Sequence, residues 1–362
     1  MTGVIEHRRI TRFQFPRGRV IGDSQIRVDT HHIGALELIS TDGSVGLGFF
    51  GTLVYPLPPL TELERVFDTE VGPQVLAQPP AALLNRVTRP RGGNIRSHIF
   101  TQAVDQALWD LQAKAAGLPL HRLLGGTSDR VRAYASGLEF HLSIDEMTTL
   151  FAEAAARGFT AFKVKVGHPD LRWDLARLRA VVDVVGPDAQ LMVDANEAWS
   201  PKEAIRRAHA YRDAGFNIFW IEDPCLRDDF EGLARVCQAV PFAHINSGEY
   251  LDLRGKSLLM AARAVDILNV HGHISDTLIA ARLAASYGIP VSLGNTPLEL
   301  GVHLAVALPE VVWMEYSFQD YDALVEEPIV FEHGSALAPD RPGHGLTLSE
   351  TARKEFARPA VE

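Results

Sequence analysis

The chain has 362 residues, 46% of them hydrophobic and 22% charged, with a formal net charge of −10. A chain of this length is longer than one ordinary hydrophobic core usually covers, which favours a large barrel or two associated domains. No apolar run approaches the roughly 18 residues of a membrane span, and Lys and Arg form no cluster that would follow a nucleic-acid backbone. We therefore expect neither a membrane nor a nucleic acid as a partner.

The first residues and the cysteines bear on where the protein works. MTGVIEHRRI has no apolar signal core, so we expect a cytoplasmic protein. Cys225 and Cys237 are too few for a disulfide framework or a zinc pattern, and we expect both to be reduced thiols.

Residues 1–128 predict a small α+β domain. Thr41-Asp42-Gly43 separates the apolar runs Ala35–Ser40 and Ser44–Phe49, which is typical of a β-hairpin. Thr101–Ala116 shows helical periodicity and ends at Gly117 and Pro119.

Residues 129–322 predict a barrel, because short apolar runs alternate there with longer amphipathic stretches. Ser200-Pro201-Lys202-Glu203 forms the pattern of a capping box at the start of one such stretch, and Gly158 and Gly215 follow two others as helix-ending glycines. Eight runs suit a closed barrel of alternating strands and helices; they are Val131–Ala135, Phe162–Val166, Leu191–Asp194, Ile218–Glu222, Ala243–Gly248, Asp266–His271, Pro290–Gly294 and Val312–Tyr316. We expect the irregular residues 323–362 to return to the first domain.

Three carboxylates end successive predicted strands. Asp194, Glu222 and Glu249 are spaced by 28 and 27 residues, about one strand-helix unit each. In a barrel such strand ends share one mouth, where three acids would repel one another unless a cation lay between them. Oxygen ligands favour Mg²⁺. The alternative is that each acid caps a helix or pairs with a surface lysine.

Cationic side chains are expected in the same mouth. Lys163 and Lys165 alternate on one strand and so face the same side. Beside a second cation and a metal, Lys165 is expected to have a lowered pKa and to act as a base. His271 ends the sixth strand, across the mouth from the lysines. It could act as an acid or base or be a structural residue, and His273 is the alternative candidate. Asn196, Asn295 and Glu315 also lie near strand ends, where they could orient water or bind substrate.

Four strand motifs resemble the enolase superfamily: Lys163-Val164-Lys165, Val193-Asp194-Ala195-Asn196, Ile221-Glu222-Asp223-Pro224 and Ser247-Gly248-Glu249-Tyr250. Glu249 as the third ligand resembles the mandelate racemase branch, and further matches reach from Ala107-Leu108-Trp109-Asp110 to Pro342-Gly343. The resemblance implies an α/β fold, a modified (β/α)7β TIM-type barrel with an α+β capping domain completed by the C-terminal segment. It also implies Mg²⁺ on Asp194, Glu222 and Glu249, with Lys165 removing an α-proton to give an enediolate.

The sequence departs from the branch at the opposite face of the site. The seventh strand ends Ser292-Leu293-Gly294-Asn295, so the usual His–Asp dyad is absent, and His271 stands at the sixth strand. The first hypothesis is dehydration of a sugar acid by Lys165, with His271 assisting departure of the hydroxyl. The alternative is a racemase, epimerase or cycloisomerase with Lys165 and His271 on opposite faces, and a third is a sugar-acid binder without catalysis.

A capping loop is expected to cover the substrate, which we expect to be a small carboxylate. Its candidate residues could bind hydroxyls or a distal carboxylate, or could belong to a solvated loop; they are Arg17, Arg19, Asp23, His31 and His32. We also expect the protein to be a homo-oligomer.

Overall fold

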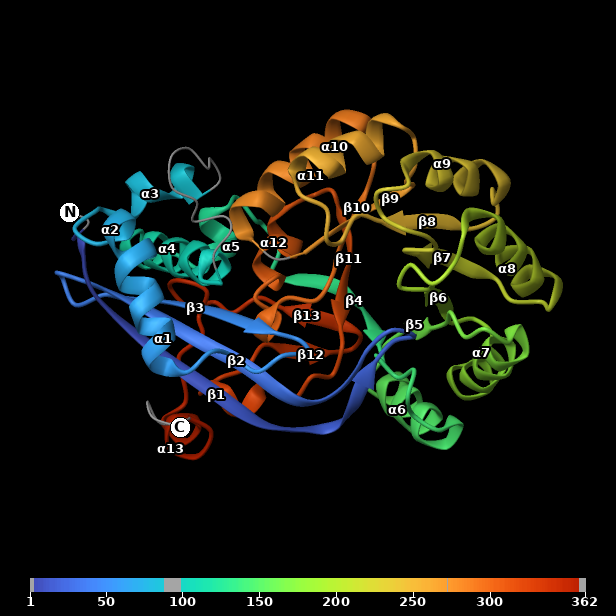
Figure 1. Ribbon diagram of the computed structural model, residues 1–362, viewed down its shortest axis with the longest axis horizontal. Coiled ribbons are helices and arrows are strands. Elements are labelled where there is room, and N and C mark those ends of the chain that lie inside the picture. Colours follow the sequence, from blue (N-terminus) through green and yellow to red (C-terminus); the bar gives the residue numbers. More distant parts are fainter. Residues whose placement is uncertain (1–2, 88–98, 272, 358–362) are drawn as a thin grey trace.

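The computed structural model describes residues 3–87, 99–271 and 273–357 (Figure 1). Three antiparallel strands form a cap sheet: β1 (Ile5–Gly22), β2 (Arg27–Ser40) and β3 (Val45–Thr52). The predicted turn between β2 and β3 is confirmed, and Gly43 adopts there a φ of 82° that favours glycine.

The predicted helix over Thr101–Ala116 is α4 (Thr101–Ala115), which packs on the cap sheet. Gly48 of β3 makes this packing close, since a Cβ there would lie 1.9 Å from the carbonyl oxygen of Ala103. Shorter helices complete this region: α1 (Leu60–Val66), the π-helix η1 (Phe67–Val71), α2 (Gly72–Val75), α3 (Pro80–Val87) and α5 (Leu120–Leu123).

Eight parallel strands form a barrel that closes between β11 and β4. Each lies within one residue of its predicted bounds at both ends: β4 (Arg130–Ser136), β5 (Ala161–Lys165), β6 (Gln190–Asp194), β7 (Ile218–Glu222), β8 (His244–Ser247), β9 (Ile267–Val270), β10 (Val291–Leu293) and β11 (Val311–Tyr316). Seven strand-helix units and a final strand follow in order, which confirms the (β/α)7β barrel with its cap.

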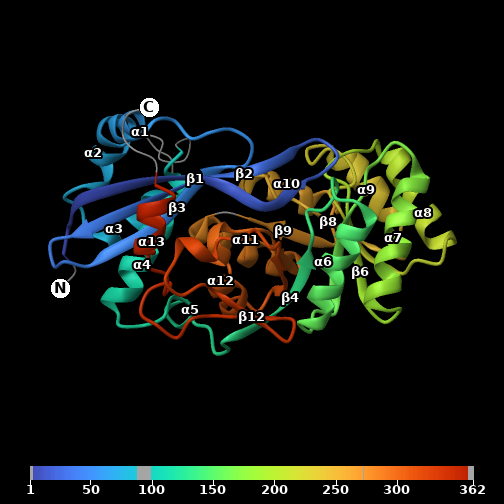
Figure 2. The same cartoon turned by 90° about the horizontal axis from the view of Figure 1, so that it is seen from below.

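The helices between these strands surround the barrel (Figures 1 and 2). They are α6 (Ile144–Ala156), α7 (Leu171–Val185), α8 (Pro201–Asp213), α9 (Phe230–Ala239), α10 (Leu253–Ala261), α11 (Ile274–Tyr287) and α12 (Val302–Ala307), with the 3-10 turn η3 (Pro297–Glu299) before the last. Within the described residues, no helix is long and apolar enough to cross a membrane.

The expected helix caps are partly confirmed. Ser200 accepts a hydrogen bond from the backbone N–H of Glu203, but the predicted reciprocal half of this capping box is wrong. The Glu203 carboxylate bonds Arg206 and Arg207 instead, because two guanidinium groups lie within its reach. Gly158 and Gly215, with φ of 86° and 89°, follow the ends of α6 and α8 as predicted.

The C-terminal segment contacts both barrel and cap. It contains η4 (Asp322–Leu324), β12 (Val330–Glu332), β13 (Ser335–Leu337) and α13 (Glu350–Glu355), and β13 pairs antiparallel with β4. Farther along, the His344 N–H donates to Asp110 of α4 at 2.9 Å, and Arg353 pairs with Glu37 of β2 at 2.8 Å. Figure 2 shows α13 beside the cap strands.

The hairpin of β1 and β2 extends from the cap to the barrel mouth. At its tip the Gly22 N–H donates to Leu138 O at 2.9 Å, and Ile26 O contacts His141 Nε2 at 2.7 Å. The expectation of a loop is therefore wrong for Arg17 and Arg19 on β1 and for His31 and His32 on β2, because both strands extend over the barrel, with an irregular pairing between Pro16 and Ile21. Of the five candidates only Asp23 lies in the turn.

Candidate active site

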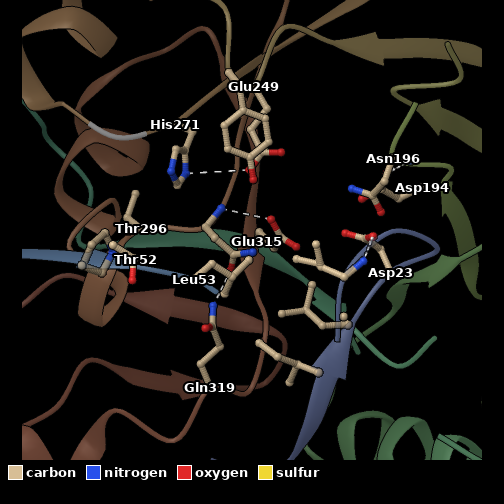
Figure 3. Close-up of a pocket in the computed structure, with 18 of the residues that line it drawn as sticks. Asp23, Thr52, Leu53, Asp194, Asn196, Glu249, His271, Thr296, Glu315 and Gln319 are labelled. Atoms are coloured by element: carbon tan, nitrogen blue, oxygen red, sulfur yellow. Dashed lines mark hydrogen bonds and ion pairs between the residues drawn. The ribbon is translucent and has the colours of Figure 1, made fainter. Parts of the chain in front are cut away.

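A cavity of about 500 Å³ lies at the carboxyl ends of the barrel strands, under the hairpin of β1 and β2 (Figure 3). The barrel contributes charged side chains from several different strands, and the cap contributes polar and apolar ones. Convergence follows from the fold, because parallel strands present their carboxyl ends to one mouth. All three predicted metal ligands and both lysines line it.

Lys165 and Asp194 form the first pair of the site. Lys165 Nζ donates to Asp194 Oδ2 at 2.6 Å and to Asn196 Oδ1 at 2.8 Å, and both lysine and aspartate are buried. Asn196 has a φ of 45°, a conformation that Asn tolerates better than most residues, and its N–H donates to Asp194 Oδ1 at 2.9 Å. The aspartate, the lysine and the amide are thus fixed relative to one another.

Lys163 lies deeper among two glutamates. Its Nζ is 2.8 Å from Glu222 Oε1 and 3.2 Å from Glu315 Oε1, and the Asn269 amide also donates to Glu222 Oε1 at 3.1 Å. Glu222 Oε2 is buried without a hydrogen-bond partner. One oxygen of Glu222 is therefore saturated and the other is available.

Glu249 and His271 face each other on the third side, with His271 Nδ1 3.8 Å from Glu249 Oε1 (Figure 3). Burial, followed by repulsion from Glu315, raises the pKa of Glu249 to about 7. Burial lowers the pKa of His271. A carboxyl group that is only partly ionised near pH 7, beside a neutral imidazole, is expected where a site holds too little positive charge.

Both lysines have raised pKa values without a metal ion, whereas the lowering expected for Lys165 assumed a metal beside it. Burial lowers the pKa of Lys165, but the Asp194 carboxylate outweighs it. Burial also lowers the pKa of Lys163, but the Glu222 and Glu315 carboxylates raise it by more. The lowering expected for Lys165 rested on a neighbouring cation and a metal ion, and the carboxylates that raise its pKa are the proposed ligands of that ion.

Negative charge exceeds positive charge in this site. Two buried lysines face four buried carboxylates, those of Asp194, Glu222, Glu249 and Glu315. Among the residues that the structure describes, no three His, Cys, Asp or Glu side chains are arranged to hold a metal ion, and the two lysines bond carboxylate oxygens of Asp194 and Glu222. The donor set nevertheless fits a hard divalent cation, since it offers carboxylate oxygens, one of them unpartnered, and uncompensated charge.

Two family models match the chain. The Enolase C-terminal domain-like model matches residues 146–352, and the Mandelate racemase / muconate lactonizing enzyme N-terminal domain model matches residues 21–125. The chain belongs to the enolase superfamily. It is an enzyme of the group resembling mandelate racemase and muconate lactonizing enzyme.

Relatives of this enolase-superfamily chain are known in sequence and structure. It is 36% identical to 3,6-anhydro-alpha-L-galactonate cycloisomerase of Streptomyces coelicolor over 71% of each chain. It superposes on a mandelate racemase-like protein of Mesorhizobium loti with a TM-score of 0.95 and 55% identity, over 98% of this chain and 95% of that one. It also matches L-talarate/galactarate dehydratase of Salmonella typhimurium, solved with Mg and L-lyxarohydroxamate, at a TM-score of 0.87 and 28% identity over 99% and 94% of the chains.

The remaining predicted residues of this superfamily member fall in different places. Asn295, Arg17 and His32 line the cavity, and the Asn295 N–H donates to Glu315 Oε2 at 3.0 Å. His273 does not line it, so its predicted contact with substrate is wrong in this structure. The reason is local: His273 is the N-cap residue of α11 and lines a neighbouring cavity beside Lys256.

Sequence reasoning missed several residues of the cavity wall. Thr52 and Leu53 come from the end of β3, Thr296 from the loop after β10, and Gln319 and Tyr321 from the segment after β11. No motif marks them, since each lies outside the strand-end pattern. The antiparallel pairing of β2 with β3, predicted from the Asp-Gly turn, is the one signal that could have placed Thr52 beside His32.

Proposed function

We propose that this chain is a Mg²⁺-dependent dehydratase of a sugar acid, in which Lys165 removes the proton next to the substrate carboxylate. The observation that supports it best is the pair of Lys165 and Asp194 in one cavity, which sets an amine 2.6 Å from a predicted metal ligand. A base must lie beside the group that binds the carboxylate, because the proton to be removed is on the next carbon.

Asp194, Glu222 and Glu249 would hold the Mg²⁺, as the excess of buried carboxylates and the Mg-liganded dehydratase relative both support. Bound there, Mg²⁺ would stabilise the negative charge that develops on the substrate carboxylate as the α-proton leaves. The ion would also relieve repulsion among the carboxylates.

The chain's own residues would each have a separate role in this reaction. Mg²⁺ on Asp194 would offset the charge that raises the pKa of Lys165, so that Lys165 accepts the α-proton as the free amine, while Asn196 keeps its Nζ directed into the cavity. Lys163 compensates Glu222 and Glu315. The hairpin of β1 and β2 covers the mouth and would shield a bound substrate from water.

Elimination follows when the electrons of the broken C–H bond form a C=C bond and the β-hydroxyl departs as water with one proton. His271 lines the cavity and is proposed to assist that departure. The resulting enol becomes a 2-keto acid when its carbon takes up a proton and its hydroxyl group loses one. A polyhydroxylated substrate suits the polar wall formed by Thr52, Thr296, Asn295 and Gln319.

The test is a screen of C5 and C6 aldonic and aldaric acids with Mg²⁺, read by formation of a 2-keto acid. Wild type should form product from at least one acid, and Lys165→Met should not. Lys202→Met is the matched control, because Lys202 is exposed on α8, and it should keep the wild-type rate. Absence of product from every acid would count against dehydration.

A racemase, epimerase or cycloisomerase is the second candidate. It is favoured by the placement of His271 and Lys165 on different strands around one cavity and by the cycloisomerase relative. This reaction would require both residues and would release no water. Conversion of an acid to an isomer of the same mass, lost in both Lys165→Met and His271→Asn, would support it over dehydration.

We also propose, from the sequence alone, a cytoplasmic homo-oligomer whose domains meet near residues 129 and 323. Light scattering on the purified chain tests the oligomer, and limited proteolysis tests the boundaries. A monomer, or cleavage confined to other positions, would contradict these two proposals.

A further inference from the structure

Arg17 lies in the active-site cavity without a carboxylate partner. It is on β1, the strand that covers the barrel mouth, and it lines the cavity. Among the described residues its side-chain partners are neutral: Nη1 donates to Gln319 Oε1 at 3.1 Å, Tyr321 is a second partner, and Nε is buried without one. Two other arginines of β1, Arg8 and Arg9, pair with carboxylates.

The side chains that contact Arg17 are neutral. Burial and the Arg17 charge together lower the pKa of His31 to about 3, so that imidazole adds no charge. Gln319 accepts a second hydrogen bond from the Tyr321 hydroxyl at 2.9 Å. Asp320 influences Arg17 electrostatically but is exposed and makes no ion pair with it. A partly buried guanidinium among neutral groups is costly until an anion joins it.

The cavity is therefore charged differently at its two ends. Asp194 and Glu249 lie at the end that is proposed to hold Mg²⁺ and the reacting carboxylate. Gln319, the partner of Arg17, lies apart from both in Figure 3, on the far side of Glu315. A ligand that spans the cavity would meet Arg17 with the end remote from Lys165.

We infer that the substrate bears a second carboxylate, bound by the Arg17 guanidinium, so that the acid sugar is a diacid. This inference rests on the proposed function. The planar fork of one guanidinium matches the two oxygens of a carboxylate, whereas a phosphate dianion would call for more positive charge than this wall offers.

Three groups of acids test this assignment: C5 and C6 aldaric acids, the aldonic acids of the same configuration, and the aldonic acids phosphorylated at the terminal carbon. With Mg²⁺ present, kcat/KM should favour a diacid over its aldonic partner by at least about tenfold, the range of a charge-assisted pair. A preference for the aldonic or the phosphorylated acid would overturn the inference.

Two variants and a control test whether Arg17 causes the preference for diacids. Arg17→Met should reduce the diacid-to-aldonic ratio of kcat/KM to near one, mainly through KM for the diacid. Gln319→Glu keeps the shape of its side chain and supplies Arg17 with an internal carboxylate, so it should lower the ratio as well. Arg27→Met is the control, because Arg27 is exposed on the same hairpin and does not line the cavity.

Thermal melts show whether each variant is folded. A wild-type ratio in both Arg17→Met and Gln319→Glu would overturn the role of Arg17. If no acid yields a 2-keto product or exchanges its α-proton, the proposed function itself fails. If the acids are converted but diacids are not preferred, only the inference about Arg17 and a second carboxylate fails.

Discussion

Lys165 and Asp194 are register partners on neighbouring strands of the barrel, and the lysine Nζ donates to Asp194 Oδ2 at 2.6 Å. Because the two residues are paired in register on parallel strands, the backbone hydrogen bonds between the strands hold the proposed base beside the first predicted metal ligand. Glu222 extends the same row, since it is paired in register with Asp194 on the next strand.

Removal of Lys163 should make the metal-free protein unstable. Lys163→Met leaves Glu222 and Glu315 buried without their ammonium partner, and breaking a buried pair costs about 3–5 kcal/mol. Mg²⁺ should restore part of that stability, because the cation would compensate the same carboxylates. Urea unfolding of wild type, Lys163→Met and the control Lys202→Met, with and without Mg²⁺, measures both effects. Equal loss with and without the ion would refute the shared compensation.

Mg²⁺ affinity should fall as the pH drops. Burial and Glu315 raise the pKa of Glu249 to about 7, so below that pH the metal-free protein holds a proton that a cation must displace. Between roughly pH 8 and 6 the affinity should therefore decrease, by up to about tenfold per unit for one proton. Calorimetry in buffers of different ionisation enthalpy would show proton release on binding. A flat profile would show that Glu249 is not a ligand or is already ionised.

Lys256 should support the loop that presents Glu249. Its buried Nζ donates to the carbonyl oxygens of Gly248 and Leu251 and contacts that of Glu249 at 3.3 Å. Lys256→Met removes this donor from the Glu249 and Leu251 carbonyls, which costs about 1–3 kcal/mol each if they stay buried, while Gly248 O keeps the Leu251 N–H. We expect weaker Mg²⁺ binding and a lower melting temperature than in Lys202→Met. Unchanged Mg²⁺ affinity in a folded Lys256→Met protein would contradict this role.

The cap should loosen when Asp105 is removed. Asp105 on α4 is fully buried and accepts hydrogen bonds from the Ser275 hydroxyl and, at 3.0 Å, from the Ser275 N–H of α11. Asp105→Ala leaves the Ser275 N–H without this acceptor, and we expect a loss of about 1–3 kcal/mol. Ser275→Ala should cost less, because the backbone bond survives. The reverse order in urea unfolding would show that the hydroxyl dominates.

Sequence alone predicted the barrel closely, because strand ends and helix ends carry local chemical signals. The strands recur between amphipathic helices, and residues such as Ser200 and Gly215 mark helix limits in one chain segment. The position of Lys165 and Asp194 follows from strand alternation and register, which are also local rules.

The cap side of the cavity was predicted less well, because its geometry depends on distant contacts. Arg17 and Gln319 meet across 302 positions of sequence, and no local pattern pairs them. The family resemblance places a substrate-covering loop at His32, whereas β2 continues through that residue. The raised lysine pKa values without a metal ion could not be predicted for a related reason: they depend on the distances to Asp194 and Glu222, which only the folded barrel sets.

The central claim is that Lys165 removes an α-proton, and hydrogen–deuterium exchange tests it most directly. Wild type with Mg²⁺ in D₂O, given the C5 and C6 aldonic and aldaric acids, should place deuterium at the α-carbon of a substrate or its product, as followed by NMR. Lys165→Met should show none, while Lys202→Met should match wild type. Exchange at the wild-type rate in Lys165→Met would contradict the account.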